Sequence, residues 1–406
     1  MRRREFLRAA GLVAAGTTVA PGIMEQAAGA ARVVGTVKDP YGPLGAPDAN
    51  GIRLPDGFTS RVVAITDQPV AGTGYVWHQA PDGGACFTVP GGHGAFVYVS
   101  NSETTPALGG GAGAIRFERD GEIADAYRIL SGTTRNCAGG PTPWKTWLSA
   151  EEYDDGQVWE CDPFEASQGV VRPALGTFKH EAVTVDPRGR ALYLTEDSSD
   201  GRLYRFTPDE YPSLESGRLQ VARVTDDGAF VREATAVTRG RIRWITVSDG
   251  PVGATRPRPD DSTAFDGGEG IWRSHRSVFF TTKGDDRVWM LDLRNRKLSV
   301  IYDDDLVTDG PLRGVDNVTV SRADEILVAE DGDPEPDSAM QINVINRARG
   351  TVGPLLQIVD QPGSEITGPA FSPAGDRLFF SSQRANGGSG NGITYEVRGR
   401  FRGRRS

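Results

Sequence analysis

The chain has 406 residues, of which 38% are hydrophobic, so it can bury one large core or several smaller ones. Its formal net charge of −9 argues against nucleic acid as a partner, because binding to a phosphate backbone needs a basic face. The 52 glycines and 26 prolines indicate many tight turns, which are typical of all-β proteins.

The N-terminus has the features of an export signal. An arginine cluster and a Phe-Leu pair at residues 2–7 precede a weakly apolar run at 9–20. An arginine pair followed by x-Phe-Leu resembles the twin-arginine signal, so we predict a signal peptide over 1–30 and the twin-arginine export machinery as a partner. The apolar run is interrupted by Gly16 and Pro21, and this argues against a stable membrane anchor.

The body of the chain repeats one unit: an apolar strand, a turn, a second strand and polar residues at its end. In the clearest copy, 180–197, the turn at 186–189 separates alternating or β-branched runs. Further copies begin near residues 269, 315 and 367, and two looser copies lie upstream, at 95–103 and 143–160. The clear downstream copies follow one another at about 45–55 residues, a period typical of propeller blades.

Units of this kind cannot bury their faces singly, so they close into a ring of four-stranded sheets. We therefore predict an all-β, six-bladed β-propeller over 51–399, preceded by a linker at 31–50 and followed by a basic tail at 400–406. Residues 209–266 contain Pro, Arg and Asp clusters and are expected to hold a blade edge plus an insertion. A β-sandwich is the alternative fold, and the repeat period disfavours it.

The predicted propeller would gather many acidic residues at one place. Its innermost strands converge on a central channel, so residues at equivalent strand ends should form a ring. Those places hold Glu103, Cys137, Glu181, Glu196, Asp197, Glu269, Asp316, Asn317, Glu330 and Asp331. So many carboxylates would repel one another and shift each other's pKa unless cations lie between them. The set therefore predicts a metal-binding channel, although any single member can instead cap a strand at a solvated turn.

The segment 136–152 has the most specific composition. Cys137 precedes two glycines, whose freedom at positive φ lets the backbone approach a ligand closely, and a carboxylate pair follows. In an exported protein this setting favours a metal ligand over a buried free thiol. Cys86 and Cys161 are the other cysteines, and whether these two form a disulfide stays open.

Segments 136–152, 178–181 with 193–197, and 367–373 resemble the PhoX-type alkaline phosphatases, over about residues 51–397. The resemblance implies a six-bladed propeller, exported by the twin-arginine route, that hydrolyses phosphate monoesters at alkaline pH. It also implies irons bridged by a cysteine, together with several calcium ions in the channel.

The resemblance assigns roles to individual residues. It implies that Cys137 is the iron-bridging thiolate and that the carboxylate ligands include Glu103, Glu181, Glu196, Glu269 and Asp316. Asp197, Glu330 and Asp331 complete the predicted metal-binding set because they lie at equivalent strand ends. Two features depart from the family: the chain is compact, and Arg384 follows Gln383 where family members often carry histidine. Arg384 can clamp a phosphate bidentately as a catalytic residue, or it can be a surface residue that faces outward.

The residue types agree with this chemistry. Hard calcium prefers carboxylates, whereas a thiolate selects a softer or redox-active metal such as iron. Only four histidines occur, which argues against a histidine-rich zinc site, and the sequence has neither a Gly-x-Ser-x-Gly elbow nor a Walker loop.

We therefore expect a secreted or periplasmic, monomeric phosphatase that acts on small phosphate esters with iron and calcium. The alternatives are a calcium-dependent lactonase or phosphotriesterase, and a non-catalytic propeller that binds a partner and uses metal only for structure. Iron bound at Cys137 would distinguish the phosphatase from the lactonase or phosphotriesterase and from the non-catalytic propeller.

Overall fold

The computed structural model describes residues 33–247, 258–332, 340–385 and 391–403, all within the compact unit Ala31–Ser406. The predicted export signal at 1–30 lies outside the described residues. Regular structure is almost entirely β. The helices among the described residues are single 3₁₀ turns: η2 Pro106–Leu108, η3 Pro173–Leu175, η4 Ala234–Ala236, η5 Lys283–Asp285 and η6 Asp304–Leu306. None of them is long and apolar enough to cross a membrane.

Hydrogen bonds arrange the strands into five sheets. The first two four-stranded sheets are β4 (Pro81–Thr88), β5 (Phe96–Ser102), β6 (Gly111–Phe117) and β7 (Ile123–Ser131), and β8 (Asn136–Pro141), β9 (Trp147–Glu151), β10 (Val158–Cys161) and β11 (Val170–Val171). The third consists of β26 (Ile366–Phe371), β27 (Arg377–Ser382), β28 (Ile393–Arg398) and β3 (Thr59–Ile65). In this last sheet the C-terminal strand β28 pairs with the N-terminal strand β3, which closes the ring.

The remaining two sheets are larger. The six-stranded sheet contains β22 (Val315–Val320), β23 (Ile326–Glu330), β24 (Met340–Asn346) and β25 (Thr351–Ile358), with β1 (Thr36–Val37) and β2 (Ile52–Arg53) on its outer edge. The ten-stranded sheet contains β12 (His180–Asp186), β13 (Ala191–Glu196), β14 (Leu203–Pro208), β15 (Gly217–Asp226), β16 (Ala229–Val231), β17 (Arg239–Thr246), β18 (Gly268–Ser274), β19 (Ser277–Thr282), β20 (Arg287–Asp292) and β21 (Lys297–Asp303).

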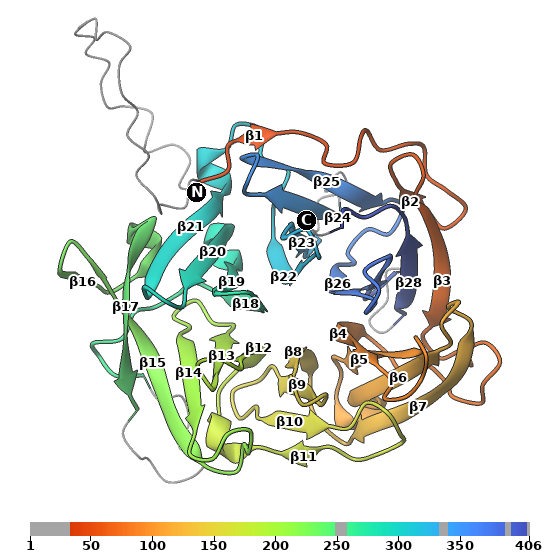
Figure 1. Cartoon of the computed structure of the whole chain (residues 1–406), viewed down its shortest axis with the longest axis horizontal. Coiled ribbons are helices and arrows are strands. Elements are labelled where there is room, and N and C mark those ends of the chain that lie inside the picture. Colours follow the sequence, from red (N-terminus) through yellow and green to blue (C-terminus); the bar gives the residue numbers. More distant parts are fainter. Residues whose placement is uncertain (1–32, 248–257, 333–339, 386–390, 404–406) are drawn as a thin grey trace, which may run out of the picture. The chain divides into compact units, whose positions relative to one another are not determined.

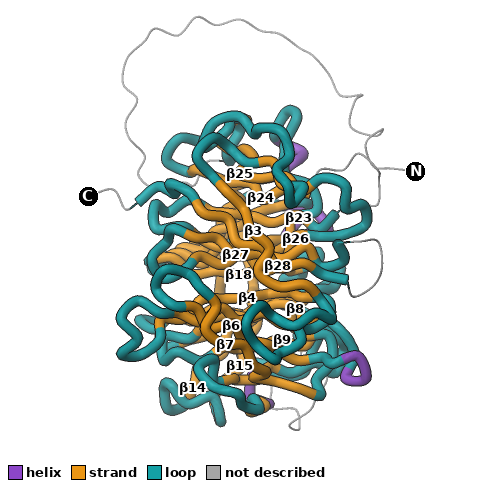
Figure 2. Tube along the Cα trace, turned by 90° about the vertical axis from the view of Figure 1, so that its right-hand side faces the viewer, coloured by secondary structure: helices purple, strands orange, loops and turns teal. Residues whose placement is uncertain are grey.

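The sheets stand around a common centre, which confirms the all-β, propeller-like fold and excludes the β-sandwich (Figure 1). The view from the side shows the strands of successive sheets beside one another (Figure 2). Six separate sheets were predicted, whereas the hydrogen bonding gives five. The difference arises in the segment expected to hold an insertion, where β17 pairs with both β15 and β21 and thereby joins two four-stranded runs.

Small residues let the innermost strands approach one another closely. A Cβ atom added at Gly83 would lie 2.4 Å from the Cα of Ala138, and one at Gly270 would lie 2.7 Å from the Cα of Asn317. Both contacts join neighbouring sheets. The same strands line a narrow central cavity of about 30 Å³ whose walls include Gly83, Ala138, Gly270 and Gly368. This packing holds the first residues of the inner strands near the centre.

All three cysteines are free thiols, so Cys86 and Cys161 do not pair. Cys161 is buried beside Trp147 in the core between two sheets, whereas Cys86 is only partly buried.

Candidate metal centre

Every inner strand has an irregularity near its start. The pairing register between the inner strand and its neighbour shifts within the first few residues of β4, β8, β12, β18, β22 and β26. A β-bulge of this kind bends the strand and re-aims a side chain. The residue that follows the first paired residue of each inner strand is called here an inner position. The six inner positions are Asp82, Cys137, Glu181, Glu269, Asp316 and Thr367.

A second set of equivalent positions lies where the adjoining strand ends. There the backbone N–H donates a hydrogen bond to the carbonyl of the residue just before the inner strand. These residues are called rim positions, and they are Glu103, Glu152, Asp197, Lys283, Asp331 and Gln383. The fold therefore brings two matched sets of mainly acidic residues to one end of the inner strands.

In three places, a side chain on the strand beside one inner strand braces the inner position of the following inner strand. The amide of Asn101 donates a hydrogen bond of 3.0 Å to the carbonyl of Cys137. The hydroxyls of Thr195 and Thr281 donate bonds of 2.5 Å to the carbonyls of Glu269 and Asp316, respectively. Because these donors are themselves buried, the backbone of each inner position is fixed before any ligand arrives.

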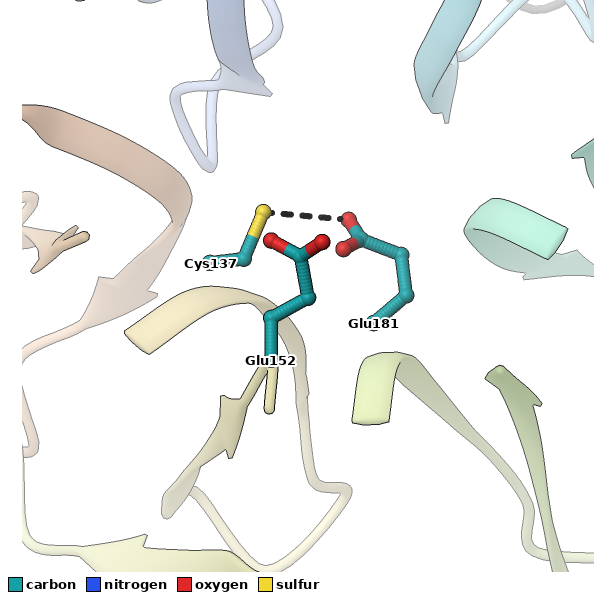
Figure 3. A group of neighbouring side chains, drawn as sticks. All are labelled: Cys137, Glu152 and Glu181. Atoms are coloured by element: carbon teal, nitrogen blue, oxygen red, sulfur yellow. Dashed lines mark hydrogen bonds between the residues drawn. The ribbon is translucent and has the colours of Figure 1, made fainter. Parts of the chain in front are cut away.

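Cys137, Glu152 and Glu181 form the first group of possible metal ligands. One potential ligand atom from each lies within 4.8 Å of the others. Their side chains point toward one another, and the Sγ of Cys137 donates a hydrogen bond of 3.4 Å to Oε1 of Glu181 (Figure 3). The group combines one sulfur donor with carboxylate oxygens.

Glu181, Glu269 and Asp316 form the second group, again with ligand atoms within 4.8 Å. All three residues are at most 4% exposed. The buried Oε2 atom of Glu181 has no hydrogen-bond partner among the described residues. A buried polar atom without a partner is costly, so this oxygen fits a bound cation. Glu181 belongs to both groups and links them.

Burial and mutual repulsion disfavour negative charge in this cluster. Burial, and then the charge of Glu269, raises the pKa of Glu181 well above its ordinary value. Burial is also the first cause that raises the pKa of Glu152 to about 8 and that of Asp316 to about 7. Burial, followed by the charge of Asp82, raises the pKa of the Cys137 thiol. These ligands must therefore release protons when they bind a cation.

Three other predicted ligands lie at rim positions but outside both groups. Glu103 accepts a hydrogen bond of 2.8 Å from Nε2 of Gln383. Asp197 lies 2.6 Å from Nζ of Lys179, whose hydrogen bond and charge outweigh burial and lower the pKa of Asp197. Asp331 lies 2.9 Å from Nζ of Lys283.

Glu196 and Glu330 end their strands one residue before a rim position. Successive side chains of a strand point to opposite sides, so each points away from the side that its neighbour occupies. Glu196 is bound by Arg258 at 2.6 Å and by the hydroxyl of Tyr204 at 3.1 Å. Glu330 accepts hydrogen bonds from backbone N–H groups, including that of Gln341 at 3.0 Å. Their oxygens thus serve contacts within the protein.

Several residues at the centre were absent from the predicted set. Asp82 occupies an inner position, and Glu152 and Lys283 occupy rim positions. Asp82 is followed by two glycines, just as Glu269 is followed by Gly270. An acidic residue before glycine at the start of an inner strand is the sequence signal that could have identified Asp82. Glu365 is buried, and its pKa is raised first by burial and then by the charge of Asp331. No sequence motif around Glu365 distinguishes it.

Arg384 lies at the edge of the acidic centre. Its guanidinium is 2.8 Å from Oε1 of Glu365 and 4.0 Å from Oε2 of Glu103, and its side chain is 39% exposed. Lys283 brings a second cation: its Nζ is 3.1 Å from Oε1 of Glu269 and 2.9 Å from Oδ2 of Asp331. Arg384 and Lys283 therefore both bring positive charge to acidic residues of the centre.

Comparison with known families decides what this acidic centre belongs to. A family model described as alkaline phosphatase PhoX matches residues 77–158 and 154–294, which together make up more than half of the 406-residue chain. The chain belongs to the PhoX alkaline phosphatase family. The matched residues include the inner positions from Asp82 to Glu269 and the rim positions from Glu103 to Lys283.

Solved structures share the fold. The structure of Pseudomonas fluorescens PhoX in complex with vanadate, a transition-state analogue, is 18% identical, covers 90% of this chain and 98% of its own, and has a TM-score of 0.72. A gluconolactonase from Xanthomonas campestris is 12% identical, covers 89% of this chain and 98% of its own, and has a TM-score of 0.50. A search of curated proteins gave no significant match. At these identities the solved structures show the fold alone.

Proposed function

We propose that this PhoX-family chain is a secreted phosphomonoesterase that holds iron and calcium ions at the centre of a six-bladed propeller. The blade count treats the ten-stranded sheet as two blades, β12–β15 and β18–β21, joined by β17. One observation carries the proposal: a thiol and four carboxylates meet in two groups that share Glu181. Family membership supports the reaction class.

The donor types divide the metals between the two groups. The first group contains the sulfur of Cys137, and a thiolate favours iron over calcium. The second group consists of oxygens only, and calcium prefers these. Glu181 has one oxygen near Cys137 and one without a hydrogen-bond partner among the described residues, so its carboxylate would contribute to holding cations in both groups. Glu103, Asp197 and Asp331 stay proposed ligands at the rim, and Glu196 and Glu330 would need to leave their present partners.

When bound, such cations neutralise the phosphate ester dianion and lower the pKa of attacking water. The side chains of this protein hold the cations and orient the phosphate ester. Cys137, Glu269 and Asp316 keep their geometry because Asn101, Thr195 and Thr281, respectively, donate hydrogen bonds to their backbone carbonyls. Arg384 is anchored by one nitrogen on Glu365, and its exposed part offers further N–H donors to phosphate oxygens.

Export is part of the proposal. The arginine pair near the N-terminus and the small residues before Ala31 support twin-arginine export with cleavage near residue 30. The folded enzyme would then work outside the cytoplasm, as a monomer on small phosphate esters.

A substrate assay tests the proposed reaction against the lactonase alternative. The purified mature protein should hydrolyse a chromogenic phosphate monoester at alkaline pH, and excess chelator should abolish this activity until calcium is restored. Turnover of a lactone without turnover of the phosphate monoester would contradict the proposal. A lactonase would need no thiolate, so the position of Cys137 beside Glu181 favours the phosphatase.

A further inference from the structure

One of the six rim positions carries a positive charge. Four rim positions carry carboxylates and one carries the amide of Gln383, whereas the sixth carries the ammonium of Lys283. Lys283 begins the short helix η5, directly after strand β19, so its backbone occupies the same place as the carboxylate-bearing residues. This rim position therefore offers a positive charge where four other rim positions offer carboxylate oxygens.

The ammonium of Lys283 joins two carboxylates from neighbouring sheets. Its Nζ lies 3.1 Å from Oε1 of Glu269, an inner position, and 2.9 Å from Oδ2 of Asp331, the rim position of the following sheet. The Glu269 side chain is 4% exposed, so little water is available to stabilise a negative charge on its carboxylate. A divalent cation between the same two oxygens would make the same pair of contacts.

Lys179 shows that lysine neutralises another part of the rim, but in a different way. Its Nζ lies 2.9 Å from Glu152 and 2.6 Å from Asp197. Lys179 precedes its inner strand and leaves both of those rim positions acidic. Among the six rim residues, Lys283 is the one that carries a positive charge at the rim position itself.

We propose that the Lys283 ammonium is a built-in counter-cation that takes the place of one divalent cation between Glu269 and Asp331. Divalent cations then bind beside Glu181, away from Lys283. The acidic cluster holds one divalent cation fewer than it would if residue 283 carried no charge. The identity of the native metals rests on the proposed function, whereas competition between lysine and a divalent cation does not require phosphatase activity.

The test replaces Lys283 by methionine, which has a similar length but neither a charge nor a hard oxygen donor. Metal-free protein is titrated with Ca²⁺ by calorimetry. Lys283→Met should bind one more Ca²⁺ per chain than the wild type, or bind its weakest Ca²⁺ at least tenfold more tightly. Lys283→Arg keeps the charge and should match the wild type, as should Lys38→Gln at an exposed site.

Thermal unfolding gives a second readout. Without calcium, Lys283→Met leaves Glu269 and Asp331 without their shared cation, so its Tm should be lower and should rise more on adding calcium. The double variant Lys283→Met with Asp331→Asn removes one acid as well and should lose the additional Ca²⁺. If Lys283→Met folds only with calcium, that result also supports the counter-cation.

Equal Ca²⁺ number and affinity in Lys283→Met and wild type would overturn the proposal, as would a loss of Ca²⁺ from the variant. If the wild type binds no Ca²⁺ but Lys283→Met does, the counter-cation stands and the proposed calcium cluster falls. If neither protein binds Ca²⁺, both are wrong.

Discussion

At the scale of single residues, the metal centre depends on a few side chains whose direction the sequence does not reveal. Cys137 stood out because of the glycines that follow it, and the structure places it 3.4 Å from Glu181. The pairs Glu196–Asp197 and Glu330–Asp331 each looked like two ligands in sequence. Only the second member of each pair occupies a rim position. The side chain of the first member points to the other side, because successive side chains of a strand alternate in direction.

Arg384 provides a prediction at this scale. If its guanidinium binds the substrate phosphate, Arg384→Gln should raise KM by about tenfold to a hundredfold, since a hydrogen bond to a charged group contributes about 1.5–3 kcal/mol. Iron and calcium content should not change, because Arg384 contacts Glu365 and donates nothing to a metal. Steady-state kinetics and elemental analysis measure both effects. An unchanged KM would show that Arg384 is a surface residue only.

At the scale of elements, the repeated strand pairs were predictable from their alternation and turns, whereas the bulges were not. A bulge adds one residue to a strand and leaves hardly any mark in the hydrophobic pattern. The same limit applies to β17, which lies in a segment rich in Pro and Arg and nevertheless joins two sheets. Small residues such as Gly83 and Ala138 next to a ligand were the available signal, because neighbouring inner strands need close approach there.

Gly83 tests the role of this close approach. A Cβ at Gly83 would lie 2.4 Å from the Cα of Ala138 and 2.9 Å from the carbonyl oxygen of Cys137, and both are backbone atoms that cannot move freely. Gly83→Ala should therefore destabilise the protein by about 1–3 kcal/mol and lower its iron content by displacing Cys137. Gly74→Ala is the matched control, since nothing lies within 4 Å of its added Cβ. Denaturant unfolding with the same stability for both variants would refute the packing argument.

At the scale of the whole molecule, the propeller was predictable from its period, and the position of the acidic centre followed from the convergence of inner strands. The number of hydrogen-bonded sheets did not follow, because it depends on how edge strands of neighbouring units pair. The ring closes through β28 and β3, which come from opposite ends of the described chain. The two ligand groups draw on residues from Cys137 to Asp316, which lie on or next to different strands, so a local motif can reveal each member only singly.

The acidic centre predicts how the stability of the metal-free protein changes with pH. In the folded state Asp316 has a pKa of about 7 and Glu152 of about 8, both above their ordinary values of 3.8 and 4.5. Between the ordinary and the raised values the folded state binds more protons than the unfolded state, so the free energy of unfolding falls as pH rises. The buried His78 and His180 have lowered pKa values and act in the opposite direction only below pH 6.5.

The Tm of chelator-treated protein should therefore fall between about pH 7 and 8, and added calcium should raise Tm more at pH 8 than at pH 7. A scanning calorimeter measures this directly. A Tm that is constant or rises over this range in chelator would contradict the protonated state of the acidic centre.

The central claim is that Cys137 and its neighbouring carboxylates hold iron. Elemental analysis of the purified mature wild type and of Cys137→Ser tests it most directly, because a hard hydroxyl replaces a soft thiolate poorly. We expect iron and calcium in the wild type. In Cys137→Ser we expect the loss of iron, of its visible absorption and of nearly all phosphatase activity, while the variant stays folded. Equal iron content and equal turnover in the two proteins would contradict it.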